Sequence, residues 1–168
     1  MGYMGSGKSI LGFKIANKLN YKAIDLDAYI ENGEKTSIRN LFLLKGEISF
    51  RKLEAMYLKE ILEKDEDYIV SLGGGTPCYG DNLKFILENP YTISIFLQTG
   101  IEELSRRLFK EKEKRPLITH LKTMEELQEF IGKHLFERNF FYNQAQLIVK
   151  TDTKTPDVIT EEIITKLL

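Results

Sequence analysis

The 168-residue sequence predicts an α/β protein, a three-layer αβα domain whose central parallel sheet is covered by helices on both faces. Three observations predict this class. Short apolar runs of strand length alternate with longer runs of helical periodicity. A glycine-rich turn at residues 2–9 leads directly into a helical pattern. No internal repeat or linker divides the chain, so we expect one domain over residues 1–168.

The glycine-rich turn at residues 2–9 fits G-x-x-x-x-G-K-[ST], the spacing of a phosphate-binding loop. Its glycines let the backbone curl so that N–H groups point at phosphate oxygens, and the following helix adds the positive end of its dipole. In such a loop Lys8 reaches the β- and γ-phosphates and the Ser9 hydroxyl ligates Mg²⁺. The motif therefore predicts a nucleotide site of the P-loop NTPase type.

A phosphate-binding loop should follow a buried strand, and here only Met1 precedes Gly2. In mononucleotide-binding folds this first strand is central in the sheet. We expect that the chain begins further upstream and that the first strand is missing from these residues. The alternative is a sheet that is built without that strand.

The first helix is predicted over residues 9–19, and a short apolar strand follows over residues 21–27. This strand ends in Asp25 and Asp27, which face the same way in an extended run. Ligands in open α/β sheets bind just past the carboxyl ends of strands, so the two acids are candidate ligand groups. A solvated turn is the plain alternative.

Residues 37–63 have a helical pattern that Gly46 is predicted to break into two helices. In the second helix, Arg51 and Glu54 are three residues apart and share a face. Arginine suits two-point binding of a carboxylate, although a surface ion pair has the same spacing.

A buried strand is predicted over residues 68–72, and it runs straight into three glycines at 73–75. Because glycine weakens order, three in succession after a strand indicate that the backbone comes close to something. A short helix at 81–88 and a further strand at 91–97 follow.

Two capping boxes predict helix starts in the second half, Thr99 with Glu102 and Thr123 with Glu126. The long helix after Thr123 is expected to turn Phe136 toward the core, together with Met124, Leu127, Ile131 and Leu135.

The charged segment 110–116 lies between two predicted helices and ends at a proline. We expect this segment to be either a solvated loop or a lid that brings Arg115 over bound phosphates. A strand over residues 146–149 and a helix capped by Thr155, with Pro156 in its first turn, close the chain.

The composition excludes several classes of protein. A net charge of −1 gives no basic field for nucleic acid. The single cysteine, Cys78, excludes an internal disulfide framework and fits a reducing compartment, so we expect a cytoplasmic protein. No apolar run approaches the length of a membrane span, no signal peptide precedes the loop, and two distant histidines with one cysteine make no metal cage.

Several short motifs occur in a fixed order: Gly5-Ser6-Gly7-Lys8-Ser9, Asp25-Leu26-Asp27, Gly46-Glu47 through Phe50-Arg51 to Glu54, Ser71-Leu72-Gly73-Gly74-Gly75, Arg115-Pro116-Leu117, and Glu137-Arg138 before Tyr142. In this order and spacing the sequence resembles the shikimate kinase family nearly end to end. The resemblance implies transfer of the γ-phosphoryl group of ATP to the 3-hydroxyl of shikimate, a step toward chorismate and aromatic amino acids. It also implies a fold of the nucleoside-monophosphate-kinase type, with substrate-binding helices at about 27–63 and a lid at about 109–120.

The resemblance implies ATP and shikimate as small-molecule partners, Mg²⁺ as the cofactor and a monomeric state. For ATP it implies the binding residues Gly5, Ser6, Gly7, Lys8, Ser9, Ile10, Arg107, Arg115 and Pro156. For shikimate it implies Asp27, Phe42, Phe50, Arg51, Glu54, Gly73, Gly74, Gly75 and Arg138. For the metal it implies Ser9 as a direct ligand, with Asp25 and Ser71 acting through water.

The resemblance also assigns roles, with Lys8, Asp27 and Arg115 as the catalytic residues. Asp27 would hold the shikimate hydroxyls and orient or deprotonate the attacking one. The clamp for the substrate carboxylate would consist of Arg51 and Arg138, with Glu54 holding the arginines in place.

The remaining roles concern the walls of the two sites. Phe42 and Phe50 would wall the shikimate pocket, and Arg107 and the turn near Pro156 would flank the adenine. One departure is Ile10, which stands where the family usually has a second hydroxyl residue, so we expect weaker phosphate contact there.

Two other functions remain open at this point. Another small-molecule kinase of the same fold, such as gluconate kinase or a nucleoside-monophosphate kinase, shares the phosphate loop. The paired aspartates, the glycine triplet and the two arginines argue against it. A nucleotide-binding regulatory protein without turnover would follow if the incomplete sheet disabled the site.

Overall fold

The computed structural model describes residues 1–113 and 115–168, which form alternating strands and helices. The strands are β1 (Lys22–Asp25), β2 (Tyr68–Ser71), β3 (Ile95–Gln98) and β4 (Leu147–Lys150). The α-helices are α1 (Lys8–Leu19), α2 (Leu26–Glu34), α3 (Ile38–Leu62), α4 (Asn82–Glu88), α5 (Ile101–Glu111), α6 (Met124–Tyr142) and α7 (Pro156–Leu167). Two single turns of 3₁₀ helix are η1 (Thr76–Cys78) and η2 (Lys112–Lys114).

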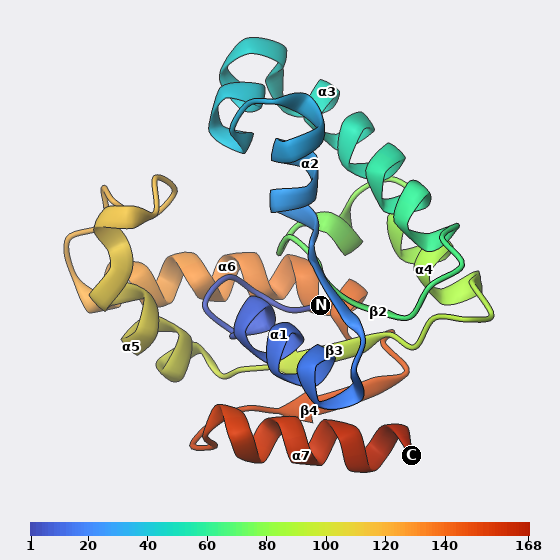
Figure 1. Cartoon of the computed structure of the whole chain (residues 1–168). Helices are drawn as coiled ribbons and strands as arrows, with labels where there is room; N and C mark the ends of the chain where they lie inside the picture. Colours follow the sequence, from blue (N-terminus) through green and yellow to red (C-terminus); the bar gives the residue numbers. More distant parts are fainter.

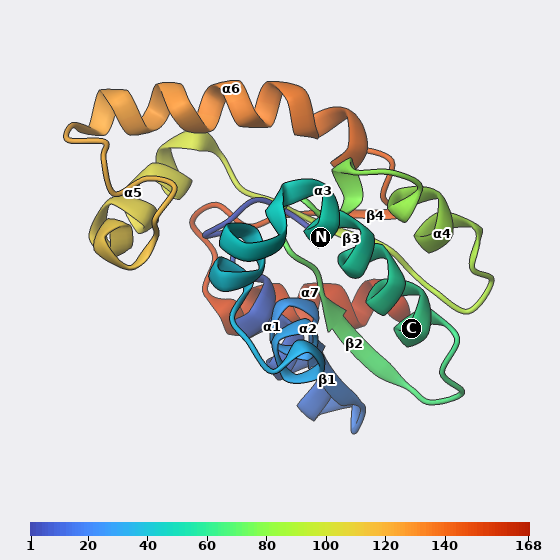
Figure 2. The same cartoon turned by 90° about the horizontal axis from the view of Figure 1, so that it is seen from above.

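The strands form two parallel pairs, β1 with β2 and β3 with β4. In these pairs Ile24 lies opposite Val70, and Leu97 lies opposite Val149. Helices α1 and α6 lie on opposite sides of β3 (Figure 2), and α7 packs against α1 and β4. The predicted three-layer αβα class with parallel strands is therefore confirmed. In the described part of the chain no helix is long and apolar enough to cross a membrane.

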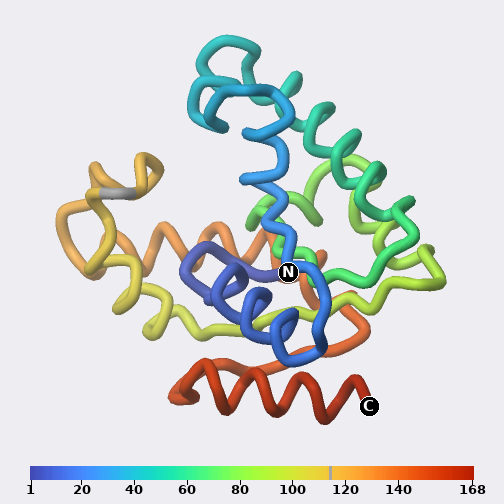
Figure 3. Tube along the Cα trace, viewed as in Figure 1, coloured from blue at the N-terminus to red at the C-terminus, as the bar shows by residue number. Residues whose placement is uncertain are grey.

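The N-terminus lies in the middle of the molecule (Figure 3), where Met1 packs against two hydrophobic clusters, one that contains Phe96 of β3 and one that Val70 of β2 also contacts. The Met1 amino group donates a hydrogen bond to the Ile95 carbonyl at 2.5 Å, and the Leu97 N–H donates to the Met1 carbonyl at 2.9 Å. These two bonds are one step of a parallel ladder along β3. As expected, no strand precedes α1 among the described residues.

The edges of β2 and β3 that face each other are not joined by hydrogen bonds in the described part of the chain. Between them lies a cavity of about 910 Å³ whose lining includes Val70 on one side and Ile95 on the other. Met1 also lines this space, and burial lowers the pKa of its amino group to about 5. The helices thus hold the two strand pairs together around the cavity at the centre of the sheet.

Two arms project from the sheet (Figure 1). One consists of α2 and the first part of α3, which kinks at Gly46 where φ is 74°. Glycine adopts this positive φ without strain, so the predicted break is confirmed. The other arm joins α5 to α6 and contains the predicted lid, of which Lys114 lies outside the described residues.

The strand predicted over residues 91–97 is shorter, since β3 begins only at Ile95. Two further predictions about element ends are wrong. The first concerns Asp27, which lies in the first turn of α2 because β1 stops at Asp25 and the Asp25 carboxylate caps that helix. The second concerns Thr99, which does not cap α5. That helix begins after Gly100, and the Thr99 hydroxyl is instead 2.6 Å from the Thr151 hydroxyl between the ends of β3 and β4.

Helix α6 begins with the predicted capping box of Thr123 and Glu126. Its buried stripe includes Leu127, Ile131 and Leu135, but the predicted inward position of Phe136 is wrong because that ring is 89% exposed. One residue beyond Leu135 is a rotation of about 100° on a helix of 3.6 residues per turn, which is enough to leave the buried face.

We expect a strand added before Met1 to stabilise this fold. An extension of about five apolar residues, the usual strand length, would continue the ladder that Met1 begins along β3, pair with the facing edge of β2 and fill the cavity between them. The midpoint of thermal unfolding should rise by at least about 5 °C.

The control is an extension of equal length made of glycine and serine. It converts the buried Met1 amine into an amide in the same way but supplies no apolar side chains. Equal melting temperatures for the two extensions would show that the cavity does not accept a strand.

Candidate active site

The phosphate-binding loop bends at Gly5 and Gly7, where φ is 80° and 90°. Glycine alone adopts these values at little cost. At Gly5 a Cβ atom would also lie 3.0 Å from the Leu108 side chain, so conformation and space both require glycine. Helix α1 begins at Lys8, and the N–H groups of its first turn have no carbonyl within the helix to bond. They form the anion-binding end of the helix.

The Lys8 ammonium group lies inside this loop and donates a hydrogen bond to the Tyr3 carbonyl at 2.9 Å. Burial is the largest influence on it and lowers the pKa of Lys8 to about 8. Neighbouring charges act in both directions, since Asp27 and Asp25 raise this pKa and Arg115 and Arg138 lower it. A phosphate group that enters the loop therefore meets a cation that is partly shielded from water.

Three oxygen-bearing side chains meet next to the loop. The Ser9 hydroxyl donates to Asp25 Oδ2 at 2.7 Å, and the Ser71 hydroxyl donates to the Lys8 carbonyl at 3.0 Å. A hydroxyl and a carboxylate are ligands of the kind that Mg²⁺ takes when phosphates and water complete its shell. No group of three or more His, Cys, Asp or Glu side chains that could cage a metal occurs among the described residues. The donor set therefore fits Mg²⁺ held jointly with a nucleotide.

Asp27 faces the glycine triplet from the first turn of α2, and the position of a Cβ atom on Gly73 would be 3.1 Å from its Oδ1 atom. Burial raises the pKa of Asp27 to about 6, and the carboxylates of Asp25 and Glu54 add to the rise. A carboxylate with a pKa near neutrality is suited to take up a proton from a hydroxyl group.

Arg51 and Glu54 form an ion pair inside the protein rather than on its surface. Arg51 Nη1 donates to Glu54 Oε2 at 2.8 Å, and the residue Glu54 is 1% exposed. The other oxygen of Glu54 accepts a hydrogen bond from the Thr76 hydroxyl at 2.7 Å. Both carboxylate oxygens are thus bonded, which a buried charge requires.

The glycine triplet after β2 passes between these charged groups. A Cβ atom on Gly75 would lie 2.9 Å from Arg51 Nη2, closer than side chains tolerate. A Cβ atom on Gly74 would lie 3.7 Å from Arg138 Nη1. The triplet therefore lets the backbone lie against both arginines, which is a close approach of the kind that three successive glycines predict.

Aromatic rings surround the Arg51 guanidinium. Phe42 and Phe50 pack with their centroids 4.5 Å apart, and Arg51 Cζ lies 5.2 Å from the Phe50 ring. The nearest ring is that of Tyr79, at 3.8 Å. Tyr79 and Thr76 contact residues of the candidate site, and sequence reasoning missed both. Their only signal is their position just after the glycine triplet.

The other arginines lie around the phosphate loop. Arg107 donates to the Gly5 carbonyl at 3.1 Å, and its Nε atom donates to Glu103 at 2.6 Å. Arg115 pairs with Glu111 at 3.1 Å. The Arg138 guanidinium lies 5.6 Å from the centroid of the Tyr3 ring. Among the described contacts, Glu54 forms an ion pair with Arg51 and none with Arg138.

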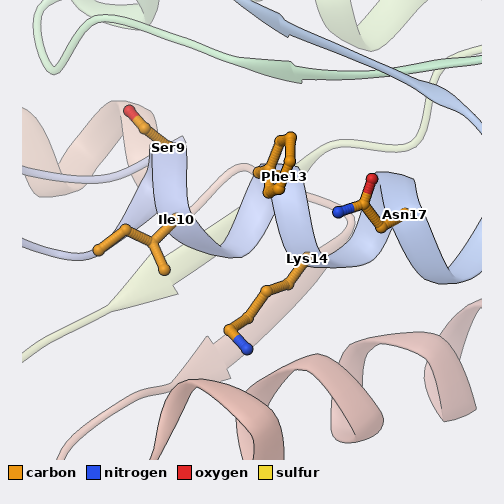
Figure 4. A pocket seen from close by; sticks show the side chains of 5 residues that line it. All are labelled: Ser9, Ile10, Phe13, Lys14 and Asn17. Atoms are coloured by element: carbon orange, nitrogen blue, oxygen red, sulfur yellow. The ribbon is translucent and has the colours of Figure 1, made fainter.

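Ile10, the remaining candidate ATP-binding residue of the loop, lies on the outer face of α1. Figure 4 shows a shallow pocket there, lined by Ser9, Ile10, Phe13, Lys14 and Asn17. Ile10 is 60% exposed, as is Phe13. Pro156 begins α7 and is exposed, and no hydrogen bond or ion pair in the described part of the chain joins it to Arg107.

Comparison with known proteins identifies the family. The sequence profile described as shikimate kinase matches residues 4–168. A shikimate kinase of Flavobacterium johnsoniae is 42% identical over 98% of this chain and 94% of its own length. The crystal structure of shikimate kinase from Bacteroides thetaiotaomicron superposes with a TM-score of 0.90 at 37% identity, covering 99% of this chain and 95% of that one.

A second solved structure, shikimate kinase from Acinetobacter baumannii in complex with shikimate, has a TM-score of 0.85 at 25% identity. The match covers 99% of this chain and 89% of that chain. The matching profile spans nearly the whole sequence, and the fold agrees with it. The chain belongs to the shikimate kinase family.

Proposed function

We propose that this enzyme transfers the γ-phosphoryl group of ATP to the 3-hydroxyl of shikimate. The observation that carries the proposal is that the phosphate loop and the candidate acceptor site lie side by side. Lys8 in the phosphate loop lies within the electrostatic reach of Asp27, and Asp27 borders the glycine triplet that Arg51 touches. A phosphate donor and a carboxylate-bearing acceptor would therefore meet at Asp27.

On the donor side the loop glycines and Lys8 cradle the phosphates of ATP. Phosphoryl transfer needs positioning and charge neutralisation more than covalent help. Lys8 and Arg115 supply positive charge where the transferring group becomes more negative. Of the other implied ATP contacts, Arg107 is supported by its bond to the Gly5 carbonyl, while Ile10 and Pro156 rest on the family resemblance.

On the acceptor side Arg51 and Arg138 bind the carboxylate of shikimate. Glu54 keeps the Arg51 guanidinium in place, and the rings of Phe42, Phe50 and Tyr79 wall this end of the pocket. Asp27 accepts the proton of the attacking hydroxyl or orients that hydroxyl for in-line attack.

Mg²⁺ bound with ATP would be ligated by Ser9, with Asp25 and Ser71 holding its water ligands. The ion would neutralise charge on the β- and γ-phosphate oxygens. Ser9 and Asp25 already share a hydrogen bond at 2.7 Å, which fixes their relative orientation.

The segment at about 109–120 acts as a lid in this proposal. It carries Arg115, whose guanidinium is held by Glu111 and influences the pKa of Lys8. Closure would exclude water, which competes with shikimate as the phosphoryl acceptor. We further expect a cytoplasmic monomer, for which the single free cysteine, Cys78, supports the reducing compartment.

The test of function is a trial of phosphate acceptors with ATP and Mg²⁺. We expect ADP release that depends on shikimate and no comparable release with gluconate or nucleoside monophosphates. Preference for either of these other acceptors would overturn the proposal, and binding of ATP and shikimate without ADP release would favour a protein without turnover.

Replacing Arg51 by alanine should weaken shikimate binding by about tenfold to 100-fold, the value of hydrogen bonds to a charged group. The KM for shikimate should rise while the KM for ATP stays within about twofold. The exposed Arg39 on the same helix gives the matched control, Arg39→Ala, which should leave both constants unchanged. Unchanged shikimate affinity in Arg51→Ala would remove Arg51 from the site.

Replacing Lys8 by alanine should lower kcat by about 100-fold or more, because a buried cation beside the transferring group is lost. Steady-state turnover with saturating shikimate measures this effect. Lys18→Ala is the control on the same helix, since Lys18 forms an ion pair with Glu161 away from the loop. A Lys8→Ala enzyme with normal kcat would contradict the role given to Lys8.

The pH profile should reflect the opposite pKa shifts of Asp27 and Lys8. The ratio kcat/KM should rise as Asp27 loses its proton near pH 6 and fall as Lys8 loses its proton near pH 8, because the reaction needs a carboxylate and an ammonium group. In Asp27→Asn the residual activity should lack the rise on the acid side. An acid limb that persists in Asp27→Asn would assign it to another group.

A further inference from the structure

One stripe of helix α6 faces both loops of the active site. His134, Arg138 and Tyr142 follow one another at intervals of four residues, so they share a face of the helix. Their partners come from opposite halves of the site. His134 Nδ1 lies 2.9 Å from the hydroxyl of Tyr3 in the phosphate loop, and the Tyr142 hydroxyl donates to the carbonyl of Gly74 at 2.5 Å.

Arg138 lies between these two contacts. Its guanidinium stacks over the Tyr3 ring at 5.6 Å, and its Nη1 atom lies 3.7 Å from where a Cβ atom on Gly74 would be. Gly74 itself approaches the phosphate loop, since the same Cβ position is 3.5 Å from the Met4 nitrogen. The carboxylate clamp, the glycine triplet and the phosphate loop thus meet at one point.

Tyr142 is rigidly held at this point. The residue is fully buried, and its ring packs against Phe96 with centroids 5.0 Å apart. Burial raises the pKa of Tyr142 above its ordinary value, so the phenol keeps its proton and remains a hydrogen-bond donor. A donor in a fixed position determines where the Gly74 carbonyl lies.

We propose that Tyr142 is a positioning residue of the enzyme, which fixes the Gly74 backbone and with the Tyr3 ring seats Arg138 against the substrate carboxylate. Tyr142 acts through these groups and has no contact with substrate of its own. This inference rests on the proposed function, because it assigns Arg138 to the shikimate carboxylate. It adds that the phosphate loop and the carboxylate clamp are aligned by one helix face.

The test compares Tyr142→Phe with wild type and with Tyr68→Phe. Phenylalanine keeps the ring and removes only the hydroxyl. Tyr68 is the matched control because its hydroxyl also donates to backbone carbonyls, those of Ile61 and Lys64, but at the far end of β2. We expect Tyr142→Phe to raise the KM for shikimate by about three- to tenfold, the value of one neutral hydrogen bond, with the KM for ATP unchanged.

The same substitution is then made in an Arg138→Ala background. If Tyr142 acts by seating Arg138, its loss should change the KM for shikimate by less than about twofold there. An equal rise in both backgrounds would overturn the link to Arg138. A KM unchanged by Tyr142→Phe, with only a lower melting temperature like that of Tyr68→Phe, would show a merely structural residue.

A second measurement does not depend on turnover. The Nε–H resonance of Arg138 in ¹⁵N NMR should shift in His134→Gln. This substitution lies at a partly exposed position and removes the imidazole that bonds the Tyr3 hydroxyl. The resonance should also shift in Tyr142→Phe when that variant folds. It should not shift in Tyr68→Phe. An unmoved resonance in His134→Gln would contradict the seating of Arg138 by this stripe. Failure of the proposed function would appear separately, as absent shikimate-dependent ADP release in the wild type.

Discussion

The Glu54 carboxylate is removed from solvent, and a buried charge of this kind is tolerated only when both oxygens are bonded. Arg51 supplies one partner from the same helix, and Thr76 supplies the other from the turn after the glycine triplet. The carboxylate therefore ties α3 to the loop that follows β2. The position of the Arg51 guanidinium and the path of the glycines both depend on this pair of bonds.

The same burial acts in opposite directions on the two groups at the centre of the site. Loss of water lowers the pKa of Lys8 and raises that of Asp27, because it disfavours the charged form of each. Each group is thus brought closer to neutrality in the absence of ligands. In the proposed reaction, phosphates that bind at Lys8 would restore a counter-charge, so binding and charge balance would be coupled.

The central layer of the fold is interrupted, yet the site is assembled. Among the described residues no hydrogen-bonded ladder joins the two strand pairs, and the loop glycines still take their left-handed conformations. The helices carry the hydrophobic clusters, which join α5 and α6 to β3 and α1 and α7 to β4. Packing of helices onto strands, more than the continuity of the sheet, therefore holds the active-site loops in place.

The sequence by itself determined the αβα class, the phosphate loop, the break at Gly46 and the pairing of Arg51 with Glu54, because periodicity, glycine conformation and helical spacing are local properties. It could not place Asp27 in a helix, because the cap formed by Asp25 competes with continuation of the strand. It also could not find Tyr79, Thr76 or Tyr142 as parts of the site. Their roles come from contacts with residues distant in the chain, and only the tertiary structure decides such contacts, since burial and long-range packing have no signature in a short segment.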